Sequence, residues 1–274
     1  MDCDSGLLAW MERELAEKGF AAGREIRYLS ETDSTNDDAA RMAAQGAAAG
    51  SIVIAARQRR GRGRLGKKWQ SKPGAGLTFS YIARPALTME EVPRLTLVAG
   101  LAVANALHEQ TGLITAIKWP NDILIAGRKV AGLLCEFHGN GSFAGSAAVV
   151  IGIGINISST TEDFPPELRR KATSLVLAGA VNPSPVNLLL SIVHHLEEQV
   201  QRMISKGFFS VLAEWKEKDA TMGKRLAWLD SGGRIVEGVS LGPDDDGMLR
   251  IRLDSGRIVQ VLSGDLSLAE DDGN

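Results

Sequence analysis

The run of residues 147–158 constrains the fold more than any other part of the sequence. It reads Ala-Ala-Val-Val-Ile-Gly-Ile-Gly-Ile-Asn-Ile-Ser, an almost unbroken series of apolar and mostly β-branched residues. Because polar residues do not alternate with apolar ones, the run predicts a strand buried on both faces at the centre of a sheet. Gly152 and Gly154 inside it predict close approach of another backbone or of a ligand. Asn156 needs a hydrogen-bond partner if it is buried.

The rest of the first 222 residues supplies further strands and several helices around this central strand. Alternating or apolar runs predict strands at residues 26–29, 51–56 and 76–83, and three strands in antiparallel succession between 114 and 137. Apolar residues at helical spacing predict helices at residues 5–18, 39–49, 92–110, 187–203 and 208–218. We therefore expect an α+β fold, with a mixed and mostly antiparallel β-sheet against which the helices pack.

The sequence changes character at about Gly223. Short apolar segments then recur between turn signals, at residues 225–229, 234–241, 248–253, 257–262 and 266–268. This close spacing is typical of a small barrel-like β module. We therefore expect two domains, residues 1–222 and residues 223–274.

A basic, glycine-rich segment at residues 57–69 joins two of the predicted strands. Seven of its thirteen residues are Lys or Arg, none is acidic, and glycines occupy positions 61, 63 and 66. Glycine lets a backbone wrap closely around a ligand, and cations with free backbone N–H groups suit phosphate. The alternative is that the segment is a solvated face or a nucleic-acid-binding patch, which charge runs usually are. A connection of this length between core strands is typically functional or mobile.

The distribution of charge argues for an anionic ligand at one site rather than for a nucleic-acid track. The formal net charge of the 274-residue chain is −2, yet residues 39–89 hold ten Lys or Arg and no acidic residue. Two cysteines are too few for a disulfide framework, and the N-terminus lacks a secretory signal. No apolar run approaches the length that spans a bilayer. We expect a cytoplasmic protein without a membrane partner.

Polar residues also gather before the helix predicted at 39–49. The segment Thr32-Asp33-Ser34-Thr35-Asn36-Asp37 places Ser34 as an N-cap and Asp37 in capping-box position. Capping alone explains these residue types. The functional alternative is that hydroxyls and free N–H groups at a positive helix end hold polar ligand atoms.

A second polar group lies where two predicted turns meet. Lys118, Asn121, Asp122 and Lys129 come together between apolar strands. Lysine at a strand edge often serves only solubility, but two lysines, an Asn and an Asp at one place also fit a binding site. Cys135 alternates with apolar neighbours, so we expect a core residue rather than a nucleophile.

Five motifs occur in one order between residues 33 and 156. They are Asp33-Ser-Thr-Asn36, Gln58-x-x-Gly61-Arg62-Gly63-Arg64-x-Gly66-x-x-Trp69, Lys118-Trp-Pro-Asn-Asp122, Lys129-x-x-Gly132 and Gly152-x-Gly154-x-Asn156. Together they resemble the biotin–protein ligase family. The resemblance implies a catalytic domain like those of class II aminoacyl-tRNA synthetases and biotin synthetases over residues 1–222. It implies an SH3-like β-barrel over residues 223–274.

The resemblance implies a reaction in two steps. The carboxylate of biotin attacks the α-phosphorus of ATP and gives biotinyl-5′-adenylate and pyrophosphate. A lysine of a biotin carboxyl carrier protein, a subunit of acetyl-CoA carboxylase or a related carboxylase, then takes the biotinyl group. Such a reaction needs cations to offset the repulsion of two anions and a closing loop to keep water from the intermediate.

The resemblance also implies roles for single residues. Biotin would contact Ser34, Thr35, Asn36, Gln58, Gly61, Arg62, Gly63, Arg64, Lys129, Gly132 and Gly154. ATP or the adenylate would contact Arg64, Lys67, Lys68, Trp69, Asn121, Asp122, Lys129 and Asn156.

Some of these roles are more specific. Lys129, Arg62 and Arg64 would be catalytic: Lys129 would bridge the biotin carboxylate and the α-phosphate, and Arg64 would restrain release of the intermediate. Trp69 would stack on adenine, and the glycines of the later motifs would leave room for the rings of the ligand. Mg²⁺ is expected with ATP, but the sequence holds no dedicated metal-binding motif.

Some members of this family also repress transcription through an N-terminal winged helix. The segment before Ser34 is too short for one, so we expect a ligase without DNA-binding activity. A homodimer formed through an edge strand of the main sheet is common among relatives and is expected here.

Two other functions fit parts of the sequence. A lipoate ligase or octanoyl transferase would resemble the region around Lys129 but would lack the Gly-Arg-Gly-Arg segment. A nucleic-acid binder would use residues 57–72 and the C-terminal module. That module has few aromatic residues and carries Asp244, Asp245 and Asp246, which disfavours phosphate contact.

Overall fold

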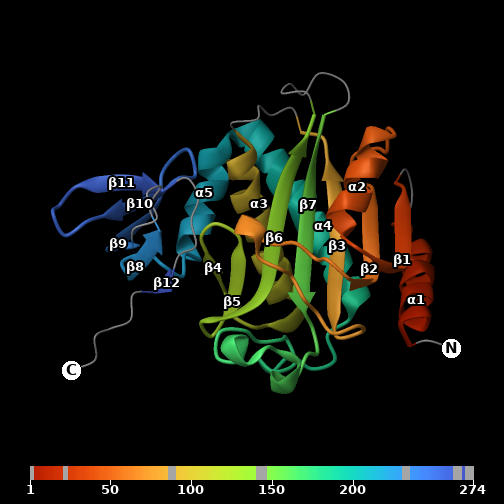
Figure 1. Ribbon diagram of the computed structural model, residues 1–274. Coiled ribbons are helices and arrows are strands. Elements are labelled where there is room, and N and C mark those ends of the chain that lie inside the picture. Colours follow the sequence, from red (N-terminus) through yellow and green to blue (C-terminus); the bar gives the residue numbers. More distant parts are fainter. Residues whose placement is uncertain are drawn as a thin grey trace.

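The computed structural model describes residues 3–20, 24–85, 91–139, 147–229, 235–261 and 267–268. Two β-sheets organise these residues, a seven-stranded sheet in the main part of the chain and a five-stranded sheet near the C-terminus (Figure 1). None of the helices in the described ranges is both long and apolar enough to cross a membrane.

The large sheet is mixed and mostly antiparallel, as expected. Its strand order is β1-β2-β3-β7-β6-β5-β4, and only the β1–β2 pair is parallel. The strands are β1 (Ile26–Thr32), β2 (Ile52–Gln58), β3 (Gly76–Ala83), β4 (Thr115–Lys118), β5 (Asp122–Ile125), β6 (Arg128–His138) and β7 (Ala148–Asn156). The predicted antiparallel succession between residues 114 and 137 is confirmed by β4, β5 and β6.

Strand β7 is the middle strand of this sheet and is buried along its whole length. It pairs with β3 on one side and with β6 on the other. The prediction of a central strand from residues 147–158 is therefore confirmed. Asn156 at its end is also buried, and its Nδ2 donates to the main-chain oxygen of Thr173 at 3.1 Å, which satisfies the amide as burial requires.

Helices cover both faces of the large sheet (Figure 1). Helix α2 (Thr35–Ala44) packs on β2, β3 and β7 around Met42, Val53 and Val150. Helices α3 (Val92–Thr111), α4 (Pro185–Lys206) and α5 (Phe208–Glu217) form the larger core on the opposite face, which α1 (Cys3–Glu17) extends over β1 and β2. The predicted helix at residues 39–49 begins and ends earlier than expected, at Thr35 and Ala44.

Local signals explain the ends of the longer helices. The Ser184 side chain accepts a hydrogen bond from the Asn187 main-chain N–H at 3.3 Å, and Pro185 occupies the first helical turn of α4. Helix α3 ends at Gly112, whose φ of 71° is the left-handed conformation that favours glycine. Both helices match the predicted spans within three residues.

The C-terminal sheet has the order β11-β10-β9-β8-β12 and is antiparallel throughout. Its strands are β8 (Arg225–Leu229), β9 (Ile235–Pro243), β10 (Leu249–Arg252), β11 (Ile258–Val261) and β12 (Ser267–Leu268). Among the described residues β11 and β12 are separate edges, so the expected barrel does not close there. The predicted turn at residues 230–233 lies outside the described residues, as do positions 234, 262 and 266.

The two sheets contact each other through the ends of α3 and β4. Trp119 Nε1 donates to the main-chain oxygen of Gly247 at 2.9 Å, and Arg94 of α3 forms an ion pair with Asp246 at 2.5 Å. The connection between α5 and β8 pairs with the outer edge of β4, where the Ile117 N–H donates to the Lys218 oxygen. The predicted boundary between residues 222 and 223 stays a prediction.

Candidate active site

The N-terminus of α2 is capped from another strand and not by its own residues. Ser34 occupies the N-cap position, but its side chain makes no capping hydrogen bond. Gln58 at the end of β2 instead accepts from the Thr35 main-chain N–H at 2.8 Å and from the Thr35 hydroxyl at 3.1 Å. The predicted capping box is therefore wrong, because the Asp37 main-chain N–H donates to the Ser34 main-chain oxygen and the Asp37 carboxylate pairs with Arg62.

A buried hydrogen-bond network continues from Thr35 across the sheet. The Ser80 hydroxyl lies 2.7 Å from both Thr35 Oγ1 and Asn36 Oδ1. Asn36 Nδ2 then donates to Glu136 Oε2 at 2.7 Å, so residues of α2, β3 and β6 form one chain of polar groups. A Cβ atom on Gly152 would lie 2.1 Å from Asn36 Oδ1. Glycine is therefore required at position 152 for Asn36 to occupy this place.

Arg62 joins this network from the basic, glycine-rich segment at residues 57–69, here called the basic loop. Its Nη2 lies 2.7 Å from Asp37 Oδ1 and 2.8 Å from Glu136 Oε2. Glu136 thus accepts from Asn36 and from Arg62 through the same oxygen. The loop is held on the sheet by a charge-assisted hydrogen bond, which is stronger than a neutral one.

Lys129 lies on β6 beside a carboxylate and an aromatic ring. Its Nζ is 2.5 Å from Asp122 Oδ1, and it lies 5.7 Å from the centroid of the Trp69 ring. A Cβ atom on Gly132 would lie 3.0 Å from Lys129 Nζ. Gly132 therefore leaves the space through which the Lys129 side chain runs.

The Trp69 indole covers the glycines that the motifs place on β6 and β7. A Cβ atom on Gly154 would be 2.2 Å from Trp69 Cε2, and one on Gly132 would be 3.2 Å from Trp69 Cζ3. The indole Nε1 is buried and has no hydrogen-bond partner among the described residues. The sequence predicted that Gly132 and Gly154 leave space for the rings of a ligand. In this structure the Trp69 ring occupies that space, so a ligand could bind there only if Trp69 moved.

The basic loop has backbone structure of its own. Gly63 N donates to Lys67 O at 2.7 Å, and Trp69 N donates to Gly61 O at 2.9 Å, around a single 3₁₀ turn at Arg64–Gly66. A Cβ atom on Gly61 would lie 2.4 Å from the Trp69 oxygen. This glycine is needed for close backbone approach.

The cations of the loop point to different places. Arg64 is largely buried against Trp119, and this burial lowers the pKa of its guanidinium below the ordinary value. Lys67 and Lys68 are exposed on the outer side of the loop. Arg62 and Lys129 are thus the two predicted catalytic cations that face the polar network and the Trp69 ring, whereas Arg64 does not join them.

Two further residues that were predicted to contact the nucleotide, Asn121 and Asn156, donate hydrogen bonds to main-chain oxygens. Asn121 Nδ2 donates to the Leu133 oxygen at 2.7 Å, as Asn156 does to Thr173. Both amides tie neighbouring segments of the site together. Their contact with a nucleotide stays a prediction.

Comparison with known proteins places this geometry in a family. Residues 28–156 match the Biotin/lipoate A/B protein ligase family, and residues 221–268 match the Biotin protein ligase C terminal domain. The chain is 34% identical to the Bifunctional ligase/repressor BirA of Bacillus subtilis over 96% of this chain and 80% of that protein. It is 31% identical to the Biotin--[acetyl-CoA-carboxylase] ligase of Mycobacterium tuberculosis over 93% of this chain and 94% of that protein.

A solved structure agrees with these sequence matches. The biotin protein ligase from Aquifex aeolicus in complex with biotin and ATP superposes with a TM-score of 0.73 at 30% identity. The match covers 89% of this chain and 98% of that one. This chain belongs to the biotin protein ligase family.

The structure of this ligase adds two residues that the motifs did not contain. Ser80 and Glu136 complete the network that joins Asn36 to Arg62. Each carried a weak signal in the sequence, because each is a polar residue between two apolar or aromatic neighbours in a predicted strand. Such a residue requires a buried partner, but the sequence did not identify that partner.

Proposed function

We propose that this chain uses ATP to activate biotin as biotinyl-5′-adenylate and transfers the biotinyl group to a lysine of a biotin carboxyl carrier protein. The observation that carries the proposal is the combination of groups in the site. Neutral hydrogen-bonding groups of Gln58, Thr35, Ser80 and Asn36 form one network, Arg62 joins it through Glu136, and a second cation, Lys129, lies on the same strand as Glu136. Biotin has matching groups, a neutral ureido ring and an anionic carboxylate.

The cations serve the first step because both reactants are anions. A carboxylate oxygen of biotin forms a bond to the α-phosphorus while the bond to the bridging oxygen breaks, and pyrophosphate leaves with that electron pair. Lys129, released from Asp122, and Arg62, released from its carboxylates, would stabilise the charge that gathers on the α-phosphate. This transfer depends on positioning and charge more than on covalent help from the protein.

The second step is an acyl transfer to an amine. The acceptor amine attacks the carbonyl carbon, the carbon–oxygen bond to AMP breaks, and the amine gives up a proton. The Trp69 ring over β6 and β7 would shield the mixed anhydride from water if it closed over the bound intermediate.

Mg²⁺ is expected as the ion that accompanies ATP. The described residues contain no group of three or more His, Cys, Asp or Glu side chains that could hold a metal ion. Asp122, the one acidic residue predicted in the site, pairs with Lys129. The residues present therefore fit an ion held by the phosphates and not by a protein cage.

Biotin-dependent exchange of label between pyrophosphate and ATP tests the proposal. The purified chain should catalyse exchange with biotin and not with lipoate, because exchange reports reversible adenylate formation. Absence of exchange with biotin would refute the first step. Transfer of biotin to a purified carrier domain, measured by mass, tests the second.

The geometry around Cys135 weighs against the alternative of octanoyl transfer. Burial raises the pKa of the Cys135 thiol to about 11. A thiol with so high a pKa is a poor acyl-transfer nucleophile at neutral pH. Thermal shift with biotin or lipoate distinguishes the two ligands directly.

Assembly and DNA binding are proposals with their own tests. A homodimer formed through the large sheet would use the outer edge of β1, because residues 218–220 pair with the outer edge of β4. Sedimentation velocity over a range of concentrations tests it. A ligase without repressor activity, in a cytoplasmic setting, stays a proposal. A gel-shift assay tests this absence of DNA binding.

A further inference from the structure

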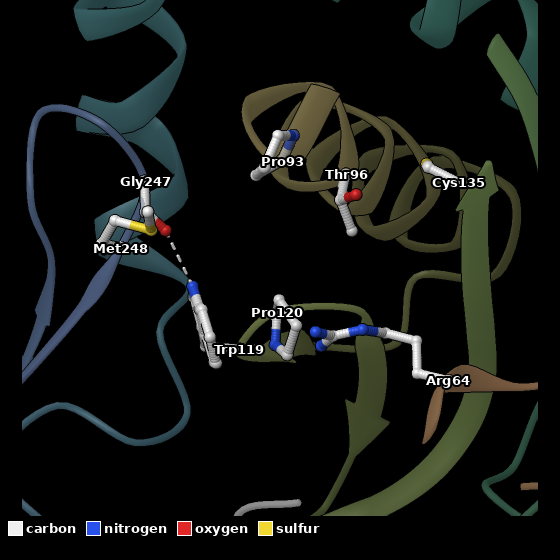
Figure 2. A pocket seen from close by; sticks show the side chains of 8 residues that line it. All are labelled: Arg64, Pro93, Thr96, Trp119, Pro120, Cys135, Gly247 and Met248. Atoms are coloured by element: carbon white, nitrogen blue, oxygen red, sulfur yellow. Dashed lines mark hydrogen bonds between the residues drawn. The ribbon is translucent and has the colours of Figure 1, made fainter. Parts of the chain in front are cut away.

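A cavity of about 190 Å³ lies between the basic loop, the start of α3 and the C-terminal sheet (Figure 2). Arg64, Trp119, Pro120, Cys135, Thr96, Pro93, Gly247 and Met248 line it. The cavity therefore brings together Arg64 of the basic loop and one turn of the C-terminal module. None of the motifs explains why these two segments meet.

Arg64 directs its guanidinium into this cavity toward Pro120 and Trp119 (Figure 2). Its Cζ lies 5.9 Å from the centroid of the Trp119 ring. No ion pair among the described residues includes Arg64, although the charge of Asp122 acts to raise the pKa of its guanidinium against the effect of burial. A buried guanidinium is costly without such contacts, and an aromatic face offsets part of that cost.

The C-terminal turn at residues 244–248, here called the 244–248 turn, is fixed from within. Asp244 Oδ1 accepts hydrogen bonds from the main-chain N–H groups of Asp246 and Met248 at 3.0 and 2.9 Å. Gly247 has a φ of 84°, and a Cβ atom there would lie 3.1 Å from Leu97 of α3. The turn is thus rigid and packs directly on the main part of the chain.

The 244–248 turn is also tied to the residue that holds Arg64. Trp119 Nε1 donates to the Gly247 oxygen at 2.9 Å, and this bond orients the ring against which Arg64 lies (Figure 2). Met248 lines the same cavity. An ion pair between Asp246 and Arg94 fixes the turn to α3 at a second point.

We propose that the 244–248 turn is a positioning element for Arg64, acting through Trp119. On the proposed function, this gives the C-terminal module a part in retaining the activated intermediate. When the turn orients Trp119, the Arg64 side chain has one defined position, against the Trp119 ring, and returns to it between turnovers. Without that orientation Arg64 samples many rotamers, and the loop loses its anchor.

Alkylation of Cys135 tests the geometry without any reference to biotin. In a Cys3→Ser background Cys135 is the single thiol, since the chain has two cysteines. Trp119→Phe keeps a ring but loses the N–H donor, so it should raise the alkylation rate roughly fivefold, as loss of one hydrogen bond permits. The matched control is Trp215→Phe, which removes an indole N–H that has no partner among the described residues.

A double-mutant cycle tests the effect on the reaction. Arg64→Ala and Trp119→Phe should each accelerate release of the activated intermediate, measured as biotinylation of bystander protein lysines. The double variant should equal Arg64→Ala alone, because Trp119 acts through Arg64. Melting curves for every variant show whether the fold is intact.

Three results would overturn the proposal. They are an unchanged alkylation rate in Trp119→Phe, an equal rise in Trp215→Phe, and multiplied release rates in the double variant. If the turn served only to stabilise the fold, Trp119→Phe would lower the melting temperature. Its effect on the release rate would then add to that of Arg64→Ala. If the proposed function is wrong, the unmodified chain will show no pyrophosphate exchange. The alkylation experiment would still test whether the 244–248 turn acts through Trp119.

Discussion

Glu136 determines how two parts of the site sit relative to each other. Its Oε2 accepts from Asn36, which belongs to the polar end of the site, and from Arg62, which belongs to the basic loop. A half-buried carboxylate that satisfies both donors orders two side chains at once. Sequence motifs weigh each residue by type and spacing, so a residue whose role is to join two motifs is easily overlooked.

Glu136→Gln tests this joint role. The amide keeps an oxygen acceptor but loses the charge that pairs with Arg62, so we expect the KM for biotin to rise about tenfold with a smaller change in kcat. Asp37→Asn is the control, because it removes the other carboxylate partner of Arg62 without touching Asn36. Pyrophosphate exchange at varied biotin gives both constants. Equal effects of the two variants would show that Glu136 matters only as one of two carboxylate partners of Arg62, which would contradict the joint role.

Lys129→Ala tests the residue that we assign to charge stabilisation in the first step. Because the developing charge on the α-phosphate would lose a nearby cation, adenylate formation should fall by about 10²–10³-fold. Single-turnover measurement with excess enzyme isolates this step. Lys72→Ala, which removes a lysine paired with Asp163, should leave the rate near normal. A near-normal rate for Lys129→Ala would remove its assigned role.

At the scale of the elements, β7 and the basic loop depend on each other. Strand β7 contributes a surface without side chains at Gly152 and Gly154, and Asn36 and Trp69 occupy those places. The loop in turn closes on itself through Gly61 and Trp69. Interiors are packed so closely that one added methyl group is felt.

Gly154→Ala should therefore displace the Trp69 indole. A Cβ atom at 2.2 Å from Trp69 Cε2 cannot be accommodated in place, so we expect a loss of about 1–3 kcal/mol in the free energy of unfolding or a ring moved into solvent. Urea unfolding and the tryptophan emission maximum measure these outcomes. Gly100→Ala in α3, where the nearest atom is 3.8 Å away, should be neutral or slightly stabilising.

The basic loop should be mobile without ligand and ordered with it. Its arginines at 57, 59 and 62 are held by largely exposed ion pairs, which are weak, and the three glycines resist bending only weakly. Cleavage by trypsin within residues 59–68 should therefore slow when biotin and ATP are added together. Cleavage at Lys206, at the end of α4, serves as an internal control. An unchanged ratio between the two sites would contradict the prediction.

At the scale of the whole molecule, the junction between α5 and β8 carries a buried carboxyl group. Asp219 Oδ1 accepts from the Thr221 N–H and hydroxyl, both at 2.7 Å, while its Oδ2 is buried without a partner in the described part of the chain. Burial raises the pKa of the Asp219 carboxyl above its ordinary value, because the charged form is poorly solvated. The folded state therefore binds this proton more tightly than the unfolded chain does.

This linkage predicts a dependence of stability on pH. Since the folded pKa is raised, the free energy of unfolding should fall as pH rises from the ordinary Asp value of 3.8 through the folded pKa. Asp219→Asn keeps an oxygen acceptor and removes the titration. Its stability relative to the unmodified chain should thus improve as pH rises from 3.8 through the folded pKa of Asp219, measured by urea unfolding. A relative stability that is flat or declines with pH would contradict the assignment.

Much of this architecture is readable from the sequence because it is encoded locally. The apolar run at 147–158, the helical spacing in α3 and α4, and the order of the ligase motifs each follow from neighbours along the chain. Periodicity specifies which face of an element is buried, and motif residues carry their chemistry with them.

Only the tertiary structure determined which residues face one another. Gln58 caps α2 from another strand, Glu136 meets Asn36 one hundred positions away, and Trp69 fills the space above Gly154. Trp119 reaches Gly247 from a distant part of the chain. These contacts depend on strand order and loop path, which local propensity does not encode. For that reason the sequence determined the family and the strands, and the packing determined the partners of each catalytic side chain.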